Sequence, residues 1–477
     1  MDQQPEEKKS RLYVLEPLVD KLPEVEVPKR HISFRERFVW TGFALAIFLV
    51  MTQISLYGLR YNPINKPVES LFGLYRFVFA SHAGTIMELG IGPIVTAGII
   101  IQLLVGSKII GLDLAKPEDR ALFTGVQKFL AVLVGIFMAA MYAFGMYPSR
   151  FGALLTTGES LFIILELSIG VIAVIYLDEL VSKYGFGSGI SLFIAAGVSA
   201  EIFVAAFNPL ASKVLTGQLS GAVPNLIKTM ITGEGLGEAF FRTAAPSMWG
   251  VIATVIIFLI AVYAESMRVE IPLAYGRFGG TRGRYPIKFL YASVIPVILA
   301  GVLFMNVRLF AGITYSRGYT FLGTFSPDNR GIPISGLVYY TDSPNGINQV
   351  TQDPLRAVTY FVALVVLCMA FAWLWINMTG MGPRDIAEQL DSSGMLIPGF
   401  RRDIRVMEQV LSRYITVVTI LGGAVIGALA ATADFLGALG SGTGILLTVG
   451  IIYGLYEEIA REQVAEMFPA IRRFFGG

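Results

Sequence analysis

The sequence has few of the residues on which most soluble proteins and enzymes depend. Only 15% of its 477 residues are charged, whereas soluble proteins carry about 25%. The single cysteine, Cys368, excludes an internal disulfide and a cysteine-cluster metal site. The two histidines, His31 and His82, lie far apart in the sequence and leave little for imidazole chemistry.

Motifs for nucleotide binding and metal-assisted hydrolysis are also missing. The sequence contains no G-x-x-x-x-G-K-[ST] motif for phosphate and no H-E-x-x-H motif for zinc. Neither histidine falls in an expected membrane span, which argues against a serine nucleophile with a histidine base inside the membrane. We therefore expect no enzymatic activity, no cofactor and no bound metal.

Long apolar runs are what the sequence has instead. Hydrophobic residues make up 54% of the chain, in repeated runs of about 20 residues, the length that crosses a bilayer. The sequence therefore predicts an all-α polytopic membrane protein with ten spans. These spans are expected at 38–57, 85–105, 125–147, 160–177, 190–207, 247–264, 289–309, 357–376, 414–432 and 437–455.

The basic residues predict how the spans are oriented. The amino terminus and the loops after even-numbered spans contain 25 Lys and Arg, against 9 in the loops after odd-numbered spans. Because positive charge gathers on the cytoplasmic side, both termini are expected to be cytoplasmic. Five spans on each side of an outside loop give the halves opposite orientations, as in many transport proteins.

This topology predicts five segments. Residues 1–37 form a cytoplasmic segment that is either a solvated tail or holds an amphipathic surface helix with Leu12, Leu15, Leu18, Val19 and Leu22 on one face. The others are an N-terminal half at 38–207, an extracytoplasmic hinge connection at 208–246, a C-terminal half at 247–455 and a cytoplasmic tail at 456–477.

Five polar side chains are expected within or at the edges of spans: Glu88, Lys128, Glu166, Asn306 and Arg308. Ionisable groups inside a membrane usually mark function. Glu88, Lys128 and Arg308 lie near span ends, however, where structural or interfacial roles are the better interpretation. Asn306 lies deeper, and an interhelical hydrogen bond or a functional role fits it equally well.

Two inside loops, 265–288 and 377–413, carry five basic residues each. They either anchor the orientation of the protein or form a docking surface for a polyanion such as RNA. The span at 85–105 is also unusual, because Gly90, Gly92 and Pro93 interrupt it. Such residues are tolerated where protein or water satisfies the freed backbone, so this span is expected to line the inside of the bundle.

The glycine-rich motifs resemble a known family. LGIGPIVTAGIIIQLLVG at 89–106 is similar to the second span of SecY, the large subunit of the protein-conducting channel. Similar blocks follow in family order at 178–197, 265–277, 283–299, 398–403 and 433–453. They cover nearly the whole chain outside the extracytoplasmic loops, and they most resemble archaeal members, which are close to the eukaryotic channel α subunit.

The resemblance implies two inverted, pseudo-symmetric five-helix halves around an hourglass pore. The pore opens across the membrane and sideways into lipid. Its constriction ring corresponds here to Ile91, Val95, Ile190, Ile194, Ile298 and Leu447. Such a ring excludes water and ions, and it offers a passing peptide no hydrogen bonds. Without the resemblance, these side chains would be interpreted as ordinary core residues.

Three further sites follow from the resemblance. The plug, a short helix below the ring, corresponds to 67–80, with Pro67, Val68, Leu71, Phe72, Leu74 and Phe77. The lateral gate corresponds to Thr96, Asn306 and Met138; relatives often carry a carboxylate at the last position, so the polar latch is weaker here. Ribosome docking corresponds to Arg277, Arg282, Arg284, Arg401 and Arg402.

The function implied is the pore-forming subunit of a translocation channel in the plasma membrane. It would pass unfolded secretory chains and release hydrophobic helices into lipid, driven by a translating ribosome or, in bacterial relatives, by a partner ATPase. Implied partners are SecE-type and small beta-type single-span subunits, the ribosome, nascent chains with signal sequences, and lipid. An inverted-repeat solute carrier is the main alternative and an intramembrane protease the third.

Overall fold

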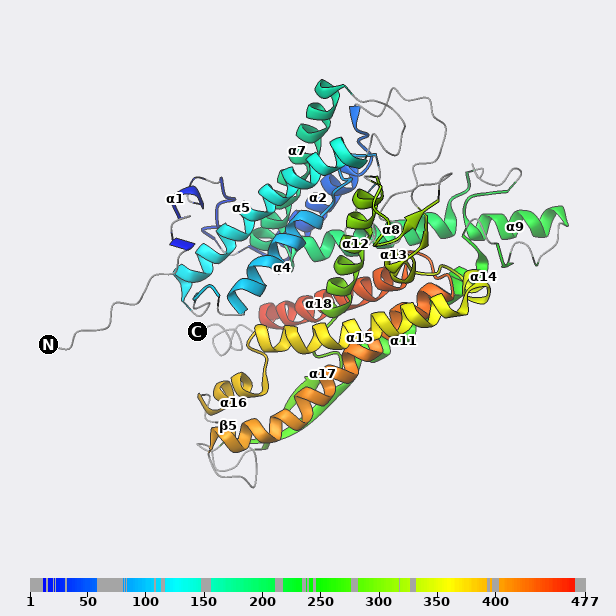
Figure 1. The fold of residues 1–477 in the computed structure, drawn as a ribbon. Coiled ribbons are helices and arrows are strands. Elements are labelled where there is room, and N and C mark those ends of the chain that lie inside the picture. The colour runs from blue at the N-terminus through cyan, green and yellow to red at the C-terminus, as the bar shows by residue number, and fades with distance from the viewer. Residues whose placement is uncertain are drawn as a thin grey trace. The chain divides into compact units, whose positions relative to one another are not determined.

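A computed structural model gives the fold of the chain (Figure 1). It describes residues 12–13, 16–19, 21, 23–30, 32–57, 80, 82, 84–106, 109–112, 116–146, 156–210, 218–233, 237, 240–242, 246–275, 282–316, 318–326, 332–392, 395–396 and 403–467. The chain forms two compact units. The described residues up to Ile190, apart from Ala80, belong to the first unit, and Ala80 with those from Ser191 onwards belongs to the second.

The first unit is helical. Its elements are α1 (Glu16–Val19), α2 (Phe34–Met51), α4 (Gly92–Gly106), α5 (Pro117–Met141), the π-helix η3 (Tyr142–Met146) and α7 (Thr157–Tyr184). Side chains cap two of them: Ser33 exchanges hydrogen bonds with Glu36 at the start of α2, and Thr156 does so with Glu159 at the start of α7. These capping boxes satisfy backbone N–H groups that a helix start otherwise leaves without a partner.

The expected span at 85–105 is helical only in its second part. Helix α4 begins at Gly92, because Gly90 adopts a left-handed conformation with φ of 50°. Residues 84–91 instead form turns. In these turns the backbone N–H of Ile86 donates to Ile54 O, and that of Gly90 donates to Met87 O. Most of the turn side chains are buried, as is required of irregular backbone at membrane depth.

The N-terminal segment packs on the start of α5. A Cβ placed on Gly125 would lie only 2.0 Å from Val19 Cγ1, so only glycine allows α1 to approach this closely. Leu12 and Tyr13 pack against the same cluster, which contains Leu122. The helix covers only Glu16–Val19, a shorter stretch than the leucine spacing predicts.

The second unit holds the remaining helices. They are α8 (Gly189–Phe207, whose first two residues belong to the first unit), α9 (Ala222–Thr232), α11 (Met248–Ser266), α12 (Ile295–Ser316), α13 (Leu337–Thr341), α14 (Ile347–Gln352), α15 (Pro354–Met378), α16 (Pro383–Ser392), α17 (Ile404–Phe435) and α18 (Gly442–Met467). Helices α15 and α17 lie side by side (Figure 1). Gly423 and Gly427 of α17 face the backbone of Cys368 and Val365, and such small residues let membrane helices approach closely.

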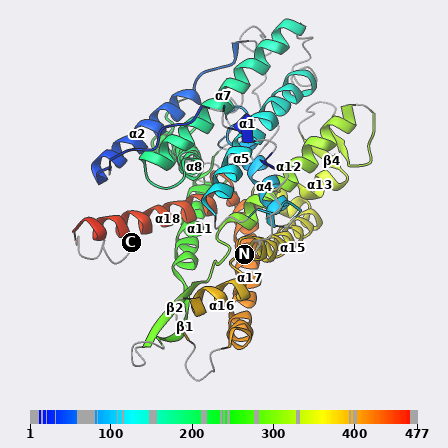
Figure 2. The ribbon, with the colours of Figure 1, turned by 90° about the vertical axis from the view of Figure 1, so that its left-hand side faces the viewer.

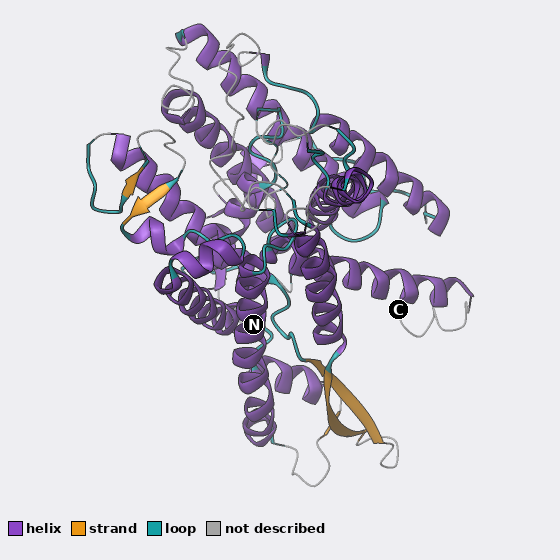
Figure 3. Cartoon of the chain, turned by 90° about the vertical axis from the view of Figure 1, so that its right-hand side faces the viewer, coloured by secondary structure: helices purple, strands orange, loops and turns teal. Residues whose placement is uncertain are grey.

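Two small sheets accompany these helices, and Figure 3 shows their strands in orange. Strands β1 (Arg268–Tyr275) and β2 (Arg282–Lys288) form an antiparallel hairpin, and β5 (Met395–Leu396) adds to the other edge of β1. Strands β3 (Thr324–Phe325) and β4 (Pro333–Ser335) form the second sheet. The two basic loops that are expected on the inside, which are far apart in the sequence, therefore meet in one three-stranded sheet.

Each of the ten expected spans overlaps one helix: α2, α4, α5, α7, α8, α11, α12, α15, α17 or α18. Among the described residues, eight helices are long and apolar enough to cross a membrane. The remaining two are α2, whose first turn carries three charges, and α4, which at 15 residues is about 22 Å long. The expected all-α polytopic fold is confirmed.

Candidate functional site

The residues of the first unit that are expected to form the ring lie at helix starts. Ile91 directly precedes α4 rather than lying inside a longer helix, but its carbonyl accepts the backbone N–H of Val95 at 3.1 Å. The two side chains are therefore still one helical turn apart. Asp178, near the end of α7, accepts the backbone N–H of Ile190 at 2.8 Å and fixes where α8 begins. Ile91 is fully buried, and Val95 and Ile190 are half-buried.

The residues of the second unit that are expected to form the ring lie close to glycine contacts on α18. A Cβ on Gly444 would lie 3.4 Å from Val198, one turn beyond Ile194 in α8. A Cβ on Gly450 would lie 3.1 Å from Val294, one turn before Ile298 in α12. Leu447 lies between these two glycines and is fully buried. The absence of side chains at both glycines lets the helices that carry Ile194 and Ile298 approach α18 near Leu447.

A buried carboxylate fixes the start of α18. Asp434, at the end of α17, accepts hydrogen bonds from Ser343 Oγ at 2.9 Å, Tyr360 Oη at 3.1 Å and the Gly442 backbone N–H at 2.6 Å. It is 3% exposed. Its negative charge lies at the N-terminal, partly positive end of α18, where it is favourable. The sequence predicts only a short outside turn between two spans at Asp434, so the role of this residue was not apparent from the sequence.

The expected gate residues are half-buried in each unit. Thr96 lies on α4 and Met138 on α5, two helices that pack together in the first unit. Asn306 lies on α12 of the second unit. Met138 offers only an apolar side chain, in keeping with its residue type.

The ionisable groups in spans have structural partners, which supports their interpretation as structural. Lys128 Nζ lies 2.9 Å from Glu179 Oε1, and Lys183 Nζ lies 2.7 Å from the same atom. Glu166 accepts the Tyr57 backbone N–H at 3.1 Å. Three more groups are paired as follows: Glu88 with the backbone N–H of Gly84, and Arg308 and Arg356 with Asp342.

The expected docking surface is described in part. Arg284 lies on β2 with its side chain 76% exposed, and it pairs with Glu270 across the hairpin. Arg282 lies opposite Ala274 in the same hairpin. Arg277, Arg401 and Arg402 lie outside the described residues, as do all six plug positions. The alternation of Val269, Ile271 and Leu273 in the sequence indicates a strand at β1. Residues 265–288 were expected only as a loop between spans, so this strand was not predicted.

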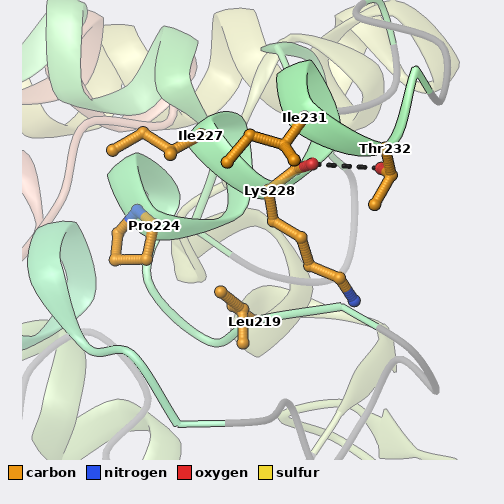
Figure 4. A pocket seen from close by; sticks show the side chains of 6 residues that line it. All are labelled: Leu219, Pro224, Ile227, Lys228, Ile231 and Thr232. Atoms are coloured by element: carbon orange, nitrogen blue, oxygen red, sulfur yellow. Dashed lines mark hydrogen bonds between the residues drawn. The ribbon is translucent and has the colours of Figure 1, made fainter.

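An apolar groove lies on α9 of the second unit. It has a volume of about 370 Å³ and is lined by Leu219, Pro224, Ile227, Lys228, Ile231 and Thr232 (Figure 4). The Thr232 hydroxyl donates to Lys228 O at 3.0 Å, so this hydroxyl is engaged within the helix itself, and the surface that lines the groove is almost entirely apolar. Its lining therefore offers a ligand almost only apolar contact.

The fold and these residues define a class of protein: a polytopic helical membrane protein. Aliphatic side chains lie at the starts of its spans and where its spans pack closely together. Two family models match the chain, SecY over residues 85–456 and the plug domain of Sec61p over residues 47–84. The chain belongs to the SecY family, as the resemblance predicted.

Relatives are similar in sequence to this chain over nearly its full length. Protein translocase subunit SecY of Pyrococcus furiosus is 49% identical over 460 residues, covering 95% of this chain and 97% of the relative. Protein transport protein Sec61 subunit alpha of Dictyostelium discoideum is 39% identical over 467 residues, covering 95% and 97%.

Solved structures agree as well. One described as a protein conducting channel has a TM-score of 0.79 and 43% identity, covering 96% of this chain and 99% of the other. Sec61 in a canine ribosome-channel complex from the endoplasmic reticulum has a TM-score of 0.77 and 43% identity, with the same coverage.

Proposed function

We propose that this chain is the pore-forming subunit of a protein translocation channel. It passes unfolded secretory polypeptides across the membrane and releases hydrophobic helices sideways into lipid. It is a passive channel and not an enzyme. The observation that carries this function is the family match over residues 85–456, which includes all six aliphatic ring positions.

The proposed ring is formed by Ile91, Val95, Ile190, Ile194, Ile298 and Leu447. Three observations support it: all six side chains are aliphatic, Ile91 and Leu447 are fully buried, and the unit-two members lie near the α18 glycine contacts. A narrow aliphatic constriction stops ions by dewetting. A peptide of any sequence can still pass, because the ring makes no hydrogen bonds with it.

The remaining assignments are part of the same proposal. The plug is formed by residues 67–80, and the gate by Thr96, Met138 and Asn306. The match of the plug-domain model to residues 47–84 supports the first. The protein lies in the plasma membrane with both termini cytoplasmic, an orientation supported by the excess of Lys and Arg in the inside loops.

The partners are the ribosome, nascent chains with signal sequences, and single-span SecE-type and beta-type subunits. The canine relative, which occurs in a ribosome-channel complex, supports the ribosome. The exposed Arg284 and the joining of both basic loops in one sheet support a single docking surface for the phosphates of ribosomal RNA.

Reconstitution tests the function directly. The chain, purified with its co-purifying small subunits, is placed in lipid vesicles and supplied with ribosomes that are synthesising a secretory reporter. We expect the reporter to become protected from added protease in vesicles with the chain and to remain accessible in vesicles without it. A reporter that stays accessible in both would refute the proposed function.

A further inference from the structure

The base of the β1–β2 hairpin is fastened to α18 by one carboxylate. Arg268 and Lys288 lie directly opposite each other at the base of the hairpin. Arg268 Nη2 lies 2.6 Å from Glu457 Oε1, and Lys288 Nζ lies 2.7 Å from Glu457 Oε2. Each oxygen of Glu457 therefore binds a cation from a different strand.

This clamp is better shielded from water than the other ion pairs of the cytoplasmic sheet and its neighbouring helix. The Glu457 side chain is 17% exposed, whereas the carboxylates of the Arg284–Glu270 and Arg384–Glu388 pairs are 52% exposed. The Lys288 ammonium also lies over the ring of Tyr453, 5.5 Å from the ring centre. Tyr453 is one turn before Glu457 in α18. Shielded pairs resist salt screening, whereas exposed pairs contribute little.

The same helix carries a ring residue. Helix α18 is continuous from Gly442 to Met467, and Leu447 precedes Glu457 by ten residues, about 15 Å along the axis. Figure 2 shows the hairpin continuing directly from α11, which packs against α18. A displacement of the hairpin base therefore acts on one end of the rigid element that carries Leu447.

We propose that Glu457 is a positioning residue that couples the docking surface to the pore ring. Binding of a ribosome to the hairpin displaces the Arg268–Glu457–Lys288 clamp, and α18 carries this displacement to Leu447. The inference rests on the proposed function, because it requires both a docking surface and a ring. Coupling of this kind changes an equilibrium only when the ligand favours one arrangement of the clamp.

The test separates binding from its effect on the pore. Glu457→Gln and the matched control Glu388→Gln each remove one negative charge, but Glu388 pairs with Arg384 of its own helix on the exposed surface of α16. Each variant channel complex is placed in planar bilayers, and purified ribosomes are added. Ribosome affinity is measured by co-sedimentation, and the increase in ion conductance caused by ribosomes is measured on the same preparation.

We expect Glu457→Gln to keep its ribosome affinity while its ribosome-dependent conductance increase falls about tenfold. The Glu388→Gln control should keep both. Lys288→Met removes the cation that pairs with Glu457 Oε2, so it should also reduce the ribosome-dependent conductance increase. The double variant should lose no more than Glu457→Gln alone, because the two residues act through one contact.

Two results would overturn the inference. One is a Glu457→Gln channel whose conductance responds to ribosomes as the wild type does. The other is a parallel loss of affinity and conductance, which would mean that Glu457 only maintains the hairpin. A wild-type channel that neither binds ribosomes nor responds to them would instead overturn the proposed function, on which the inference rests.

Discussion

The side chain of Val294 lies against Gly450, where an added Cβ would come within 3.1 Å of Val294 Cγ1. Gly450 is one turn beyond Leu447 on α18, and Val294 is one turn before Ile298 on α12. This contact therefore sets the separation of two helices that each carry a proposed ring residue. A protein interior packed this closely transmits even a small displacement.

Enlarging Gly450 should therefore open the ring. In Gly450→Val the added side chain would crowd Val294 Cγ1, so either Val294 or α18 must shift to make room. We expect a higher resting ion conductance in planar bilayers, by about tenfold if the closed ring loses about 1.4 kcal/mol relative to the conducting state. Gly454→Val is the control, because a Cβ at Gly454 meets nothing within 4 Å. Equal conductance of both variants would contradict this role of the contact.

Replacing ring side chains with serine should break the seal without moving a helix. Ile91 and Ile194 are 0% and 4% exposed. A hydroxyl at either position binds water and favours a wetted pore, so Ile91→Ser and Ile194→Ser should both raise resting conductance. Ile169→Ser makes the same change at a position 55% exposed on α7 and should leave conductance unchanged.

The serine variants also bury less apolar surface. Large-to-small changes in a core lower the free energy of unfolding by about 2–5 kcal/mol. Conductance should therefore be compared at equal amounts of folded protein, measured by size-exclusion chromatography. If both variants are folded and seal as tightly as wild type, the ring is assigned to the wrong residues.

Charge reversal in the docking loops should weaken ribosome binding. Arg284→Glu and Arg401→Glu each replace a cation that is proposed to neutralise a phosphate. Affinity should fall, and the slope of log affinity against log salt should become shallower by about one per cation removed. Arg30→Glu reverses a cation that is 80% exposed on the N-terminal segment and should change neither quantity. Unchanged affinity and slope in the two docking variants would place the ribosome elsewhere.

The contact of the N-terminal segment with α5 should depend on pH. The Tyr13 hydroxyl donates to Asp119 Oδ1 at 2.7 Å, and this hydrogen bond raises the pKa of Tyr13 from 10.0 to about 12. A raised folded pKa means that the stabilisation is complete below pH 10 and is lost as the pH rises towards about 12. Limited proteolysis of the segment should accelerate in that window.

Tyr13→Phe provides the comparison. It lacks the hydroxyl, so its segment should be cleaved faster than wild type at pH 8 and should show no further tyrosine-dependent step at high pH. Cleavage that is equally fast in both proteins at pH 8 would show that this hydrogen bond does not hold the segment in place.

The amino-acid sequence alone was sufficient to predict the all-α polytopic fold, the approximate positions of the spans and the family. The length of an apolar run is a local property of the sequence. A run such as 414–432 therefore predicts a span, whichever helices it packs against. Lys and Arg counts likewise predict orientation without tertiary contacts. The aliphatic ring positions could be named only through the resemblance, because Ile194 or Leu447 alone is indistinguishable from an ordinary core residue.

Tertiary structure decided where chain segments distant in sequence meet. It made the helical part of 85–105 begin only at Gly92, placed Val19 against Gly125, paired β1 with β5 and set Glu457 between Arg268 and Lys288. Each of these contacts joins groups that are far apart in the chain or depends on a single backbone angle. Their energies come from packing and charge complementarity in three dimensions, which no local pattern of residues encodes.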